Sequence, residues 1–438
     1  EKTGNSELTE LQQDADVLDT WFSSWIWPIS VFDGIRNPEN TDYQYYFPTN
    51  DLVTGHDILF FWVARMIMAG YETAHDLPFK NVYFTGMVRD KERKKMSKSL
   101  GNSPDPITLI DKYGADGVRS GMLFSSPAGN DLLFDENLCQ QGRNFANKIW
   151  NAYKLIESWN VSDKSLKNVN VDVIFWFENK LQQDVLKINN LFSEFKISES
   201  LMVIYKLIWH DFCSSYLEII KPADKIIDQE TYSKTIYFIE SLLIVLHPFM
   251  PFISEDIWQK LSSRKNGQTI SYCEWPTFNN TKVDTEILNR FQHLFKLIAA
   301  IRKIRKDKGI SFKEKIDLLC ENDSFIAFES ILKKTCNLGK IDIYSSQHVS
   351  LFPFLVGKNR FFIPLVFHVD SEKEINRINK EINYLKGFLK SIERKLSNAN
   401  FTMNAPKNVI EVEKKKQNDT IIKIESLTKE LKTFNESR

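Results

Sequence analysis

The sequence lacks closely spaced cysteines. Its five cysteines stand far apart, and no two of them form a C-x-x-C pair (Cys139, Cys213, Cys273, Cys320 and Cys336). This spacing argues against a zinc ribbon and against a disulfide framework. We therefore expect no structural zinc and a reducing, cytoplasmic environment.

The chain also lacks an excess of charge and a long hydrophobic run. It carries 57 basic and 57 acidic side chains, so any site for a polyanion must come from local clustering. The most apolar stretch, Ser241–Ile253, is interrupted by a histidine and two prolines, which predicts no membrane span and no membrane partner. The first residues, EKTGNSELTE, contain neither an initiating methionine nor a signal peptide, so we expect a fragment entered midway.

The pattern of apolar residues changes along the chain. Its 438 residues are enough for about two to four domains. Residues 16–134 are predicted to be mixed α/β. Strands are expected at Leu52–Thr54 and Asn81–Val88, and helices at Ile58–Gly70, Ile107–Tyr113 and Ala115–Phe124. Because Ile58–Gly70 is apolar almost all round, it is predicted to be a buried helix.

The middle of the chain predicts a bundle followed by a small domain. Residues 135–305 show helical periodicity with breaks near Ser162, Pro222 and Gly267 and at the HPFMPF stretch, which predicts about four or five long helices. Residues 306–369 predict a small α/β domain. Its strands are expected at Lys315–Leu319, Ile341–Tyr344, Leu351–Val356 and Arg360–Val366, the last two joined by Gly357-Lys358-Asn359.

Residues 370–438 have the most regular pattern. Seven apolar residues follow a strict heptad spacing (Ile375, Ile378, Ile382, Leu385, Leu389, Ile392 and Leu396). After a break at Ser397–Pro406, a second seam has the same spacing (Ile424, Leu427, Leu431 and Phe434). The two seams predict an antiparallel coiled-coil hairpin. Its second helix is less regular at its start, where Glu413–Lys416 is all charge.

Three motifs have a structural and a functional interpretation. The basic run RKKMSKSLGN, residues 93–102, is either a solvated turn or a phosphate-binding loop, since its lysines and serines alternate between a strand and the helices after Pro106. Gly55 and Asp57 either admit a ligand and hold a ribose hydroxyl, or Asp57 caps a helix. The tryptophans near both motifs pack in a core more often than they wall a pocket.

The hairpin also has two interpretations. Basic residues outnumber acidic ones between Ser371 and Arg438. The hairpin is therefore either a spacer or oligomerisation element, or a basic arm that contacts nucleic acid.

Taken together, these residues resemble the valyl branch of the class I aminoacyl-tRNA synthetases along essentially the whole chain. The motifs that carry the resemblance are KMSKS at 95–99, DTWFSS at 19–24, GHDILFFW at 55–62, YGADGVR at 113–119, WHDFCSSYLEIIKP at 209–222 and LHPFMPFISEDIW at 246–258. The resemblance implies a multidomain α/β plus α fold. Its parts would be a partial doubly wound (Rossmann-like) nucleotide-binding half at 16–134, a helical anticodon-binding bundle at 135–305, a small α/β junction domain at 306–369 and a coiled-coil tRNA-binding arm at 370–438.

The sequence departs from the family pattern in one large respect. The family's first signature, His-Ile-Gly-His, is absent, and so is the editing insertion, while residues 1–15 resemble the end of the linker from that insertion. The chain therefore resembles a C-terminal portion that needs the N-terminal half of the same enzyme and is catalytically incomplete alone. A smaller departure is Glu92-Arg93-Lys94, where Gly-Arg-Lys is common; it leaves the lysines in place.

The resemblance implies ATP-dependent activation of valine to valyl-adenylate, with Mg²⁺ arriving on ATP, and transfer of valine to the 3′ end of tRNA(Val) by a monomeric enzyme. Lys95 and Lys98 would be catalytic. The ATP-binding residues would be Gly55, Asp57, Ser97, Lys98 and Ser99, and Gly101 would let the loop move. Trp21, Ile58 and Trp62 would wall the valine pocket, and the hairpin would contact tRNA (Arg394, Lys395, Lys414, Lys415 and Lys416).

Two other function classes remain open. A non-catalytic tRNA-binding module derived from a class I synthetase would keep the bundle and the arm, but it would have no need of the intact Lys95–Ser99 signature or of Gly55 and Asp57. A coiled-coil structural protein is disfavoured because the hairpin covers only residues 370–438.

Overall fold

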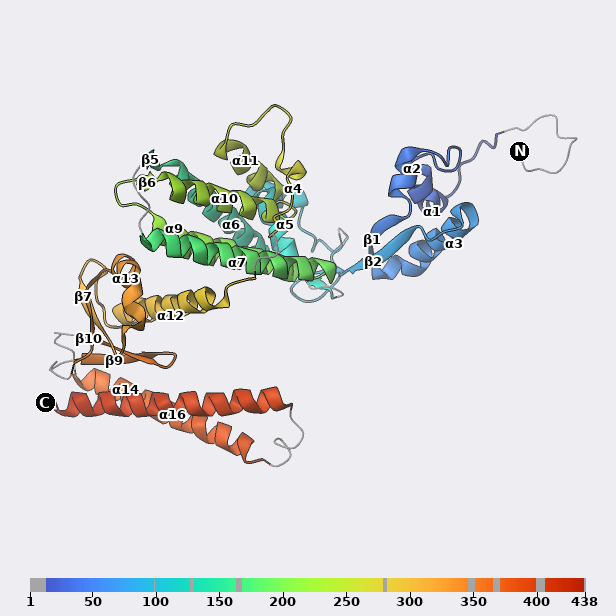
Figure 1. Cartoon of the computed structure of the whole chain (residues 1–438). Coiled ribbons are helices and arrows are strands. Elements are labelled where there is room, and N and C mark those ends of the chain that lie inside the picture. Colours follow the sequence, from blue (N-terminus) through green and yellow to red (C-terminus); the bar gives the residue numbers. More distant parts are fainter. Residues whose placement is uncertain are drawn as a thin grey trace, which may run out of the picture. The chain divides into compact units, whose positions relative to one another are not determined.

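The computed structural model of the chain describes residues 13–97, 99–126, 130–162, 168–278, 282–345, 351–364, 371–398 and 406–436 (Figure 1). It divides into two compact units. The first comprises Glu1–Asn160, Leu181–Ser214 and Tyr232–Thr281, and the second comprises Val161–Lys180, Ser215–Thr231 and Lys282–Arg438. Helices predominate in both units, and the strands form small sheets.

The first unit begins with a β-α-β arrangement. Strands β1 (Thr49–Gly55) and β2 (Phe79–Thr85) are parallel, in a register that pairs Thr49 with Phe79 and Gly55 with Thr85. Helix α3 (Ala64–Ala74) lies between them in sequence, as a parallel connection requires. Two helices precede β1, α1 (Thr20–Ser30) and α2 (Thr41–Tyr46), whose first turns are capped by Asp19 and Asn40.

The prediction that Ile58–Gly70 is helical is confirmed in part, and the prediction that it is buried is wrong. The segment starts as a 3₁₀ turn at His56–Ile58, continues as a π-helical turn at Leu59–Val63 and only then becomes α3. Val63 and Met66 pack on Phe79 of the sheet, whereas Phe60 is 75% exposed and Met68 is 69% exposed. The apolar composition suggested burial on all sides, but only the face that packs on the sheet is covered by other residues of this chain.

The predicted strand Asn81–Val88 is two strands. β2 ends at Thr85, and β3 (Val88–Arg89) pairs in parallel with β4 (Leu132–Leu133). Gly86 lies at the interruption, where an added Cβ would come within 1.8 Å of the carbonyl oxygen of Asn130. The chain therefore requires glycine at this crossing.

Helices α4 (Pro106–Tyr113) and α5 (Ala115–Phe124) lie where the periodicity predicts them, separated by Gly114 with φ +77°. Helix α6 (Glu136–Glu157) packs closely on α5. An added Cβ on Gly121 would lie 2.6 Å from the backbone nitrogen of Cys139, so glycine permits this approach.

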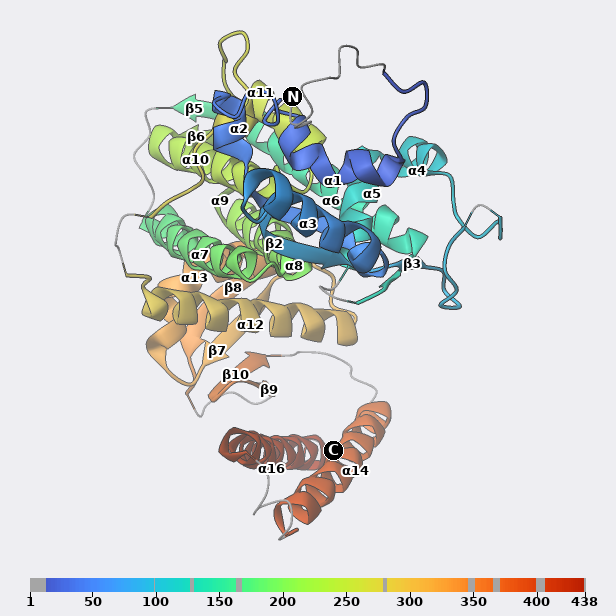
Figure 2. The same ribbon diagram turned by 90° about the vertical axis from the view of Figure 1, so that its right-hand side faces the viewer.

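The long helices of the bundle come next, and the predicted breaks between them are present. They are α7 (Asn168–Ser193), α8 (Ile197–Lys206), a π-helical run Leu207–Tyr216 that leads into α9 (Leu217–Ile220), α10 (Gln229–Leu246) and α11 (Pro251–Leu261). Short strands β5 (Asn160–Ser162) and β6 (Ile226–Asp228) pair with each other. Figure 2 gives a second view of these helices.

The second unit contains a four-stranded sheet beside α12 (Thr285–Asp307) and α13 (Glu329–Cys336). The strand order is β8 (Leu338–Ile343), β7 (Ile316–Cys320), β10 (Asn359–Pro364) and β9 (Leu351–Val356). The β9–β10 hairpin turns at Gly357, whose φ of +63° favours glycine. All four predicted strands are present: Leu351–Val356 has the predicted bounds, and the described ends of the other three lie within three residues of theirs.

The predicted helical hairpin is present as α14 (Ser371–Leu396) and α16 (Lys407–Glu436). Its core joins both predicted seams (Ile378, Ile382, Leu385, Ile424, Leu427 and Leu431). The side chains of Ile375 and Phe434 lie outside the described residues. The irregular start of the second helix is a polar continuation of the seam, because Thr420 and Glu413 lie one and two heptads before Leu427 and are buried.

Within the ranges that the structure describes, no helix is long and apolar enough to cross a lipid bilayer.

Candidate functional site

The signature loop, defined here as Asp90–Asn102, follows β3 directly. Its first part folds back on that strand, since Lys95 forms an antiparallel bridge with Arg89 and the amide of Met96 donates to the carbonyl of Val88 at 3.2 Å. The loop contains five basic and two acidic residues. Its lysines are exposed wherever they are described, so they are available to an anion from solvent.

The structure brings two sequence motifs together. Lys95 Nζ lies 3.9 Å from Asp57 Oδ2, with both side chains accessible to solvent. Asp57 follows the carboxyl end of β1, and the signature loop follows β3. Ligand sites of parallel α/β sheets occur at the carboxyl ends of strands. An exposed ion pair of this kind adds little stability. Its significance is that it places a cationic group and a carboxylate at the same edge of the sheet.

The helix-cap interpretation of Asp57 is not supported. Neither the 3₁₀ turn His56–Ile58, nor the π-helical turn Leu59–Val63, nor α3 has a side-chain cap hydrogen bond. Gly55 has φ −73°, a value that any residue adopts, but a Cβ there would lie 2.7 Å from Asp57 Oδ1. Glycine therefore lets the carboxylate fold back over the end of β1.

The two serines of the signature are neighbours. Ser97 Oγ and Ser99 Oγ lie 3.1 Å apart, and Ser97 Oγ accepts from the amide of Leu100 at 3.3 Å. Gly101 has φ +64°, and an added Cβ would meet no atom within 4 Å. Glycine is therefore needed there for the backbone conformation. Lys98, the residue predicted to contact phosphates, lies outside the described residues.

Sequence reasoning missed the two residues that close the base of the signature loop. Asp90 Oδ2 accepts from Asn102 Nδ2 at 2.9 Å, and Asn102 Oδ1 accepts from the amide of Ser97 at 3.0 Å. Asp90 Oδ1 accepts from the amides of Glu92 and Lys94. These bonds, that of Asn102 first, lower the pKa of Asp90. The available signal was a short polar side chain at each end of a basic run.

The start of α4 does not provide a phosphate site, although the sequence suggested one there. Asp105 caps this helix, and its Oδ2 accepts from both the amide and the hydroxyl of Thr108, at 2.8 and 2.9 Å. The carboxylate thus occupies the place that an anion would take.

The residues predicted to wall a valine pocket lie on α1 and on the turns before α3. Trp21 is partly exposed and its ring centroid is 6.5 Å from that of Phe61, while Ile58 is half-buried. Trp62 is half-buried against the cluster on the β1–β2 sheet, and its buried Nε1 has no hydrogen-bond partner. Trp62 is thus partly a core residue, as the structural interpretation expects.

Arg65 was not singled out from the sequence as a contact of these aromatic rings. Its guanidinium carbon lies 6.0 Å from the centroid of Trp21 and 5.0 Å from that of Trp25. These distances permit cation–π attraction, which orients the arginine toward α1.

The basic side chains predicted to contact tRNA are exposed on the hairpin (Arg394, Lys395, Lys414, Lys415 and Lys416). Two of them also balance the buried Glu413. Lys416 Nζ lies 2.8 Å and Lys395 Nζ lies 3.8 Å from its carboxylate oxygens. The hydrogen bond from Lys416 is the main cause of the lowered pKa of Glu413.

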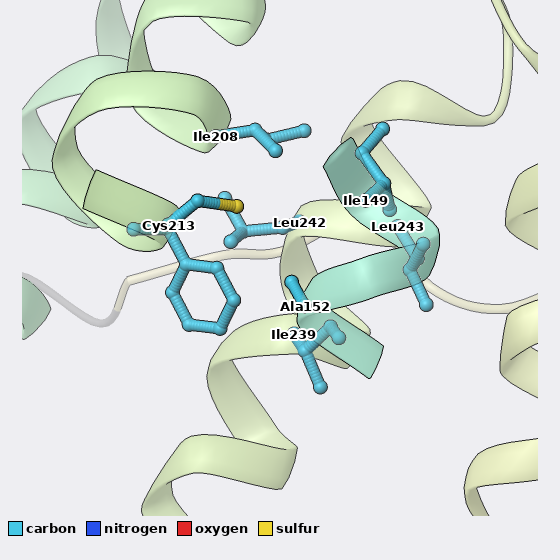
Figure 3. A pocket seen from close by; sticks show the side chains of 8 residues that line it. Ile149, Ala152, Ile208, Cys213, Ile239, Leu242 and Leu243 are labelled. Carbon is cyan, nitrogen blue, oxygen red and sulfur yellow. The ribbon is translucent and has the colours of Figure 1, made fainter. Parts of the chain in front are cut away.

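The bundle contains a small apolar cavity (Figure 3), distant in sequence from these motifs. It is lined by Ile149, Ala152, Ile208, Phe212, Cys213, Ile239, Leu242 and Leu243. Burial raises the pKa of Cys213 to about 12, so its thiol is unreactive at neutral pH. The lining has no polar group that would orient a ligand.

No group of three or more histidine, cysteine, aspartate or glutamate side chains is placed to hold a metal ion in the described part of the chain.

Three family models match successive parts of the chain. The model of class I tRNA synthetases (I, L, M and V) matches residues 2–135, and that of the anticodon-binding domain of tRNA ligases matches residues 175–320. The model of the valyl-tRNA synthetase tRNA-binding arm matches residues 370–435. The last match falls on the hairpin.

Curated relatives extend the similarity to the whole chain. The valine–tRNA ligase of Christiangramia forsetii is 49% identical over 99% of this chain and 50% of its own length. That of Bacteroides thetaiotaomicron is 50% identical over 98% of this chain and 49% of its own length. Among solved structures, a LeuRS–tRNA–LeuAMS complex from Agrobacterium radiobacter is 20% identical with a TM-score of 0.45, covering 63% of this chain and 34% of that one.

The chain spans about half the length of the curated relatives that it matches. The three models follow one another in the order of the domains expected from the sequence motifs, and the last is specific to valyl enzymes. The chain therefore belongs to the class I aminoacyl-tRNA synthetases and corresponds to the C-terminal half of a valyl-tRNA synthetase.

Proposed function

We propose that this chain is the C-terminal part of an enzyme that activates valine with ATP and transfers it to the 3′ end of tRNA(Val) in the cytoplasm. The observation that carries the proposal is the 3.9 Å approach of Lys95 Nζ to Asp57 Oδ2. It joins a basic loop suited to phosphates and a carboxylate suited to a ribose hydroxyl. The names of the relatives support valine as the substrate.

In the proposed reaction, the signature loop stabilises the charge that develops as pyrophosphate leaves. Lys98 contacts the β- and γ-phosphates in the transition state and Lys95 supports it, while Ser97 and Ser99 shape the loop. Mg²⁺ bound to the phosphates of ATP would offset part of their charge. When ATP enters, its ribose hydroxyl replaces Lys95 as the partner of Asp57, and Lys95 becomes free for phosphate.

Trp21, Ile58 and Trp62 wall the valine side chain in this proposal, and the remaining wall comes from the preceding half of the enzyme. Two features of the described residues support such a partner. The β1–β2 sheet has only two strands, fewer than an α/β layer needs for independent stability. Phe60, Phe61 and Met68 are exposed beside it, and a large exposed apolar face marks an interaction surface.

The proposed division of labour follows the domain boundaries expected from the sequence. Residues 1–15 end the linker, residues 16–134 complete the catalytic fold, residues 135–305 bind the anticodon and residues 306–369 connect the bundle to the arm. Residues 370–438 contact tRNA phosphates through Arg394, Lys395 and Lys414–Lys416, which predicts salt-dependent binding.

The test compares the chain alone with the complete enzyme. The chain alone should bind tRNA(Val) but catalyse no valine-dependent ATP–pyrophosphate exchange, and the complete enzyme should catalyse both exchange and aminoacylation. Exchange that depends on a different amino acid would exclude the substrate, and full activity of the chain alone would exclude the proposed incompleteness. Binding of tRNA without exchange by the complete protein would favour the rival function, a non-catalytic tRNA-binding module.

A further inference from the structure

The base of the signature loop is closed by a side-chain pair, Asp90 and Asn102, which we call the loop neck. The two residues lie at opposite ends of the loop, and the carboxylate of Asp90 accepts from the amide of Asn102 at 2.9 Å. Both side chains are half-buried, whereas Lys94 and Lys95 between them are exposed. The loop is thus fixed at its ends and open to solvent along its basic part.

Each member of the loop neck also holds the backbone of the segment between them. Asp90 Oδ1 accepts from the amides of Glu92 and Lys94 at 3.0 and 2.9 Å. Asn102 uses its oxygen for the amide of Ser97 at 3.0 Å and its nitrogen for the carbonyl of Lys95 at 3.3 Å. The backbone on both sides of Met96 is therefore tied to one carboxylate–carboxamide pair.

This arrangement opposes the electrostatics of the loop. Five basic side chains against two acidic ones repel one another, and repulsion would spread the loop before any anion is bound. A preorganised loop avoids the cost of ordering at the moment of binding.

We propose that Asp90 and Asn102 are positioning residues for the signature loop, holding Lys95 and Ser97 in place so that the loop receives the phosphates of ATP without being ordered first. This inference rests on the phosphate role under Proposed function, and it assigns work to two residues outside the signature itself. Neither residue touches substrate; each acts through the backbone of the loop.

The bond between the two side chains can be broken and rebuilt without changing their size. In Asp90→Asn, Oδ1 still accepts from the two backbone amides, but two amide groups now face each other across the loop neck. In Asn102→Asp, Ser97 keeps its acceptor, but two carboxylates face each other. The double exchange Asp90→Asn/Asn102→Asp restores one donor and one acceptor between the two side chains and returns the loop to its original net charge. Only the donation from residue 102 to the carbonyl of Lys95 stays lost.

The first measurement is deuterium uptake of peptides spanning Met96–Gly101 in the complete enzyme, with Glu92→Gln as the control. This control removes one negative charge, as Asp90→Asn does. It leaves the loop neck intact, because the side chain of Glu92 pairs with the exposed Lys94. Each single loop-neck exchange should speed uptake at least about tenfold, the ratio that corresponds to losing a hydrogen bond to a charged group. The double exchange should bring uptake back toward that of the parent enzyme, short of it by the lost bond to the carbonyl of Lys95, and Glu92→Gln should leave uptake unchanged.

The second measurement is binding of inorganic tripolyphosphate by titration calorimetry. By charge alone, Asp90→Asn would bind the anion more tightly and Asn102→Asp less tightly, whereas positioning predicts that both bind it more weakly and that the double exchange recovers. Behaviour of Asp90→Asn identical to that of Glu92→Gln, or no recovery in the double exchange, would overturn the inference. If uptake follows the expected pattern but the parent enzyme binds no tripolyphosphate, Asp90 and Asn102 still fix the loop and the proposed phosphate role fails.

Discussion

Asp116 and Arg119, one turn apart on α5, bind the two sides of the corner between α10 and α11. The carboxylate of Asp116 accepts from the amides of Phe252 and Ile253 at 3.3 and 2.6 Å, at the start of α11. The guanidinium of Arg119 donates to the carbonyls of Phe249 and Pro248, both at 3.1 Å. One helix face therefore supplies an acceptor for free amides and a donor for free carbonyls.

The charge state of Asp116 predicts a pH-dependent stability. Its pKa is raised from the ordinary 3.8 because burial outweighs the hydrogen bonds from Ile253 and Phe252. A raised pKa means that the folded chain holds the proton more tightly, so the contribution of Asp116 is largest below pH 3.8 and falls as the pH rises through the raised value. The free energy of unfolding of the parent chain relative to Asp116→Asn should therefore decrease with pH over this interval. Urea unfolding at a series of pH values measures it, and a difference that rises with pH would contradict the shift.

Lys98→Ala tests the phosphate role in the complete enzyme. Loss of one transition-state donor should lower valine-dependent ATP–pyrophosphate exchange at least about a hundredfold. The matched control is Lys91→Ala. Lys91 belongs to the same loop but lies outside the KMSKS motif, and its Nζ pairs with Asp135 at 3.5 Å. Equal losses in the two variants, or a loss in Lys98→Ala below about threefold, would remove Lys98 from the mechanism.

The hairpin lysines should govern the salt dependence of tRNA binding. Lys414 and Lys415 are exposed, and replacing either with alanine should weaken binding of tRNA(Val). The slope of log K against log salt should fall by about one for each phosphate that the variant no longer neutralises. Lys333→Ala on α13 is the control, because this lysine pairs with Glu329 one turn away. Filter binding between low and moderate salt provides the measurement, and an unchanged slope would refute the contact.

Deletion of Ser371–Arg438 extends the same test. The deletion should weaken tRNA binding while adenylate formation in the complete enzyme is retained, because the hairpin belongs to the second unit and the signature loop to the first. Unchanged tRNA affinity at moderate salt would show that the arm has another role.

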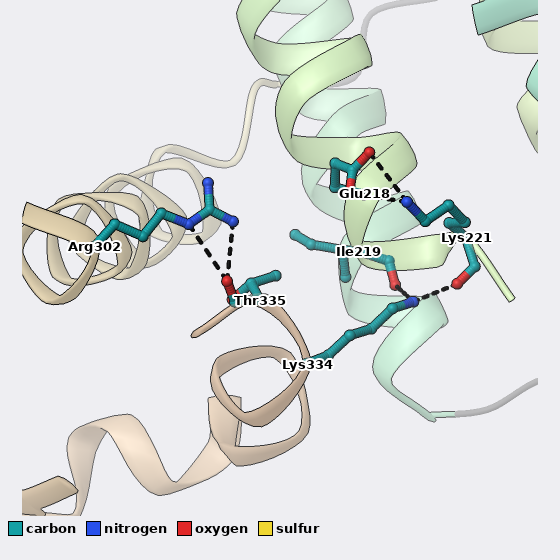
Figure 4. A network of polar contacts seen from close by, with 6 residues as sticks. All are labelled: Glu218, Ile219, Lys221, Arg302, Lys334 and Thr335. Carbon is teal, nitrogen blue, oxygen red and sulfur yellow. Dashed lines mark hydrogen bonds and ion pairs between the residues drawn. The ribbon is translucent and has the colours of Figure 1, made fainter. Parts of the chain in front are cut away.

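Lys334 joins α13 to the end of α9 within the second unit (Figure 4). Its Nζ donates to the carbonyl of Ile219 at 2.6 Å and also to that of Lys221, both near the C-terminal end of α9. Lys334→Met should lower the free energy of unfolding by about 1 kcal/mol, the typical value of such a hydrogen bond. The adjacent Lys333→Met removes only a surface ion pair and should change it by less than about 0.5 kcal/mol. Thermal and urea unfolding of the two variants would separate them, and equal effects would contradict the capping role.

Elements whose cause is local were predictable from the sequence. Heptad spacing predicted the hairpin, because apolar residues at seven-residue intervals form a continuous seam on a helix whatever the rest of the chain does. Gly357 marked the β9–β10 turn, where only glycine adopts φ +63° easily. The KMSKS motif identified the family, since its residues are contiguous in the chain.

Only the tertiary structure decided which residues distant in sequence meet and which faces of the helices are buried. Ile58–Gly70 looked buried because composition records apolar character, whereas burial depends on whether another layer covers that face. Glu413 looked like part of a solvated charge run, but its heptad position places it inside the hairpin between Lys395 and Lys416. The approach of Lys95 to Asp57 and the loop neck of Asp90 and Asn102 depend on chain crossings, and residues that meet in this way leave no periodic signal in the sequence.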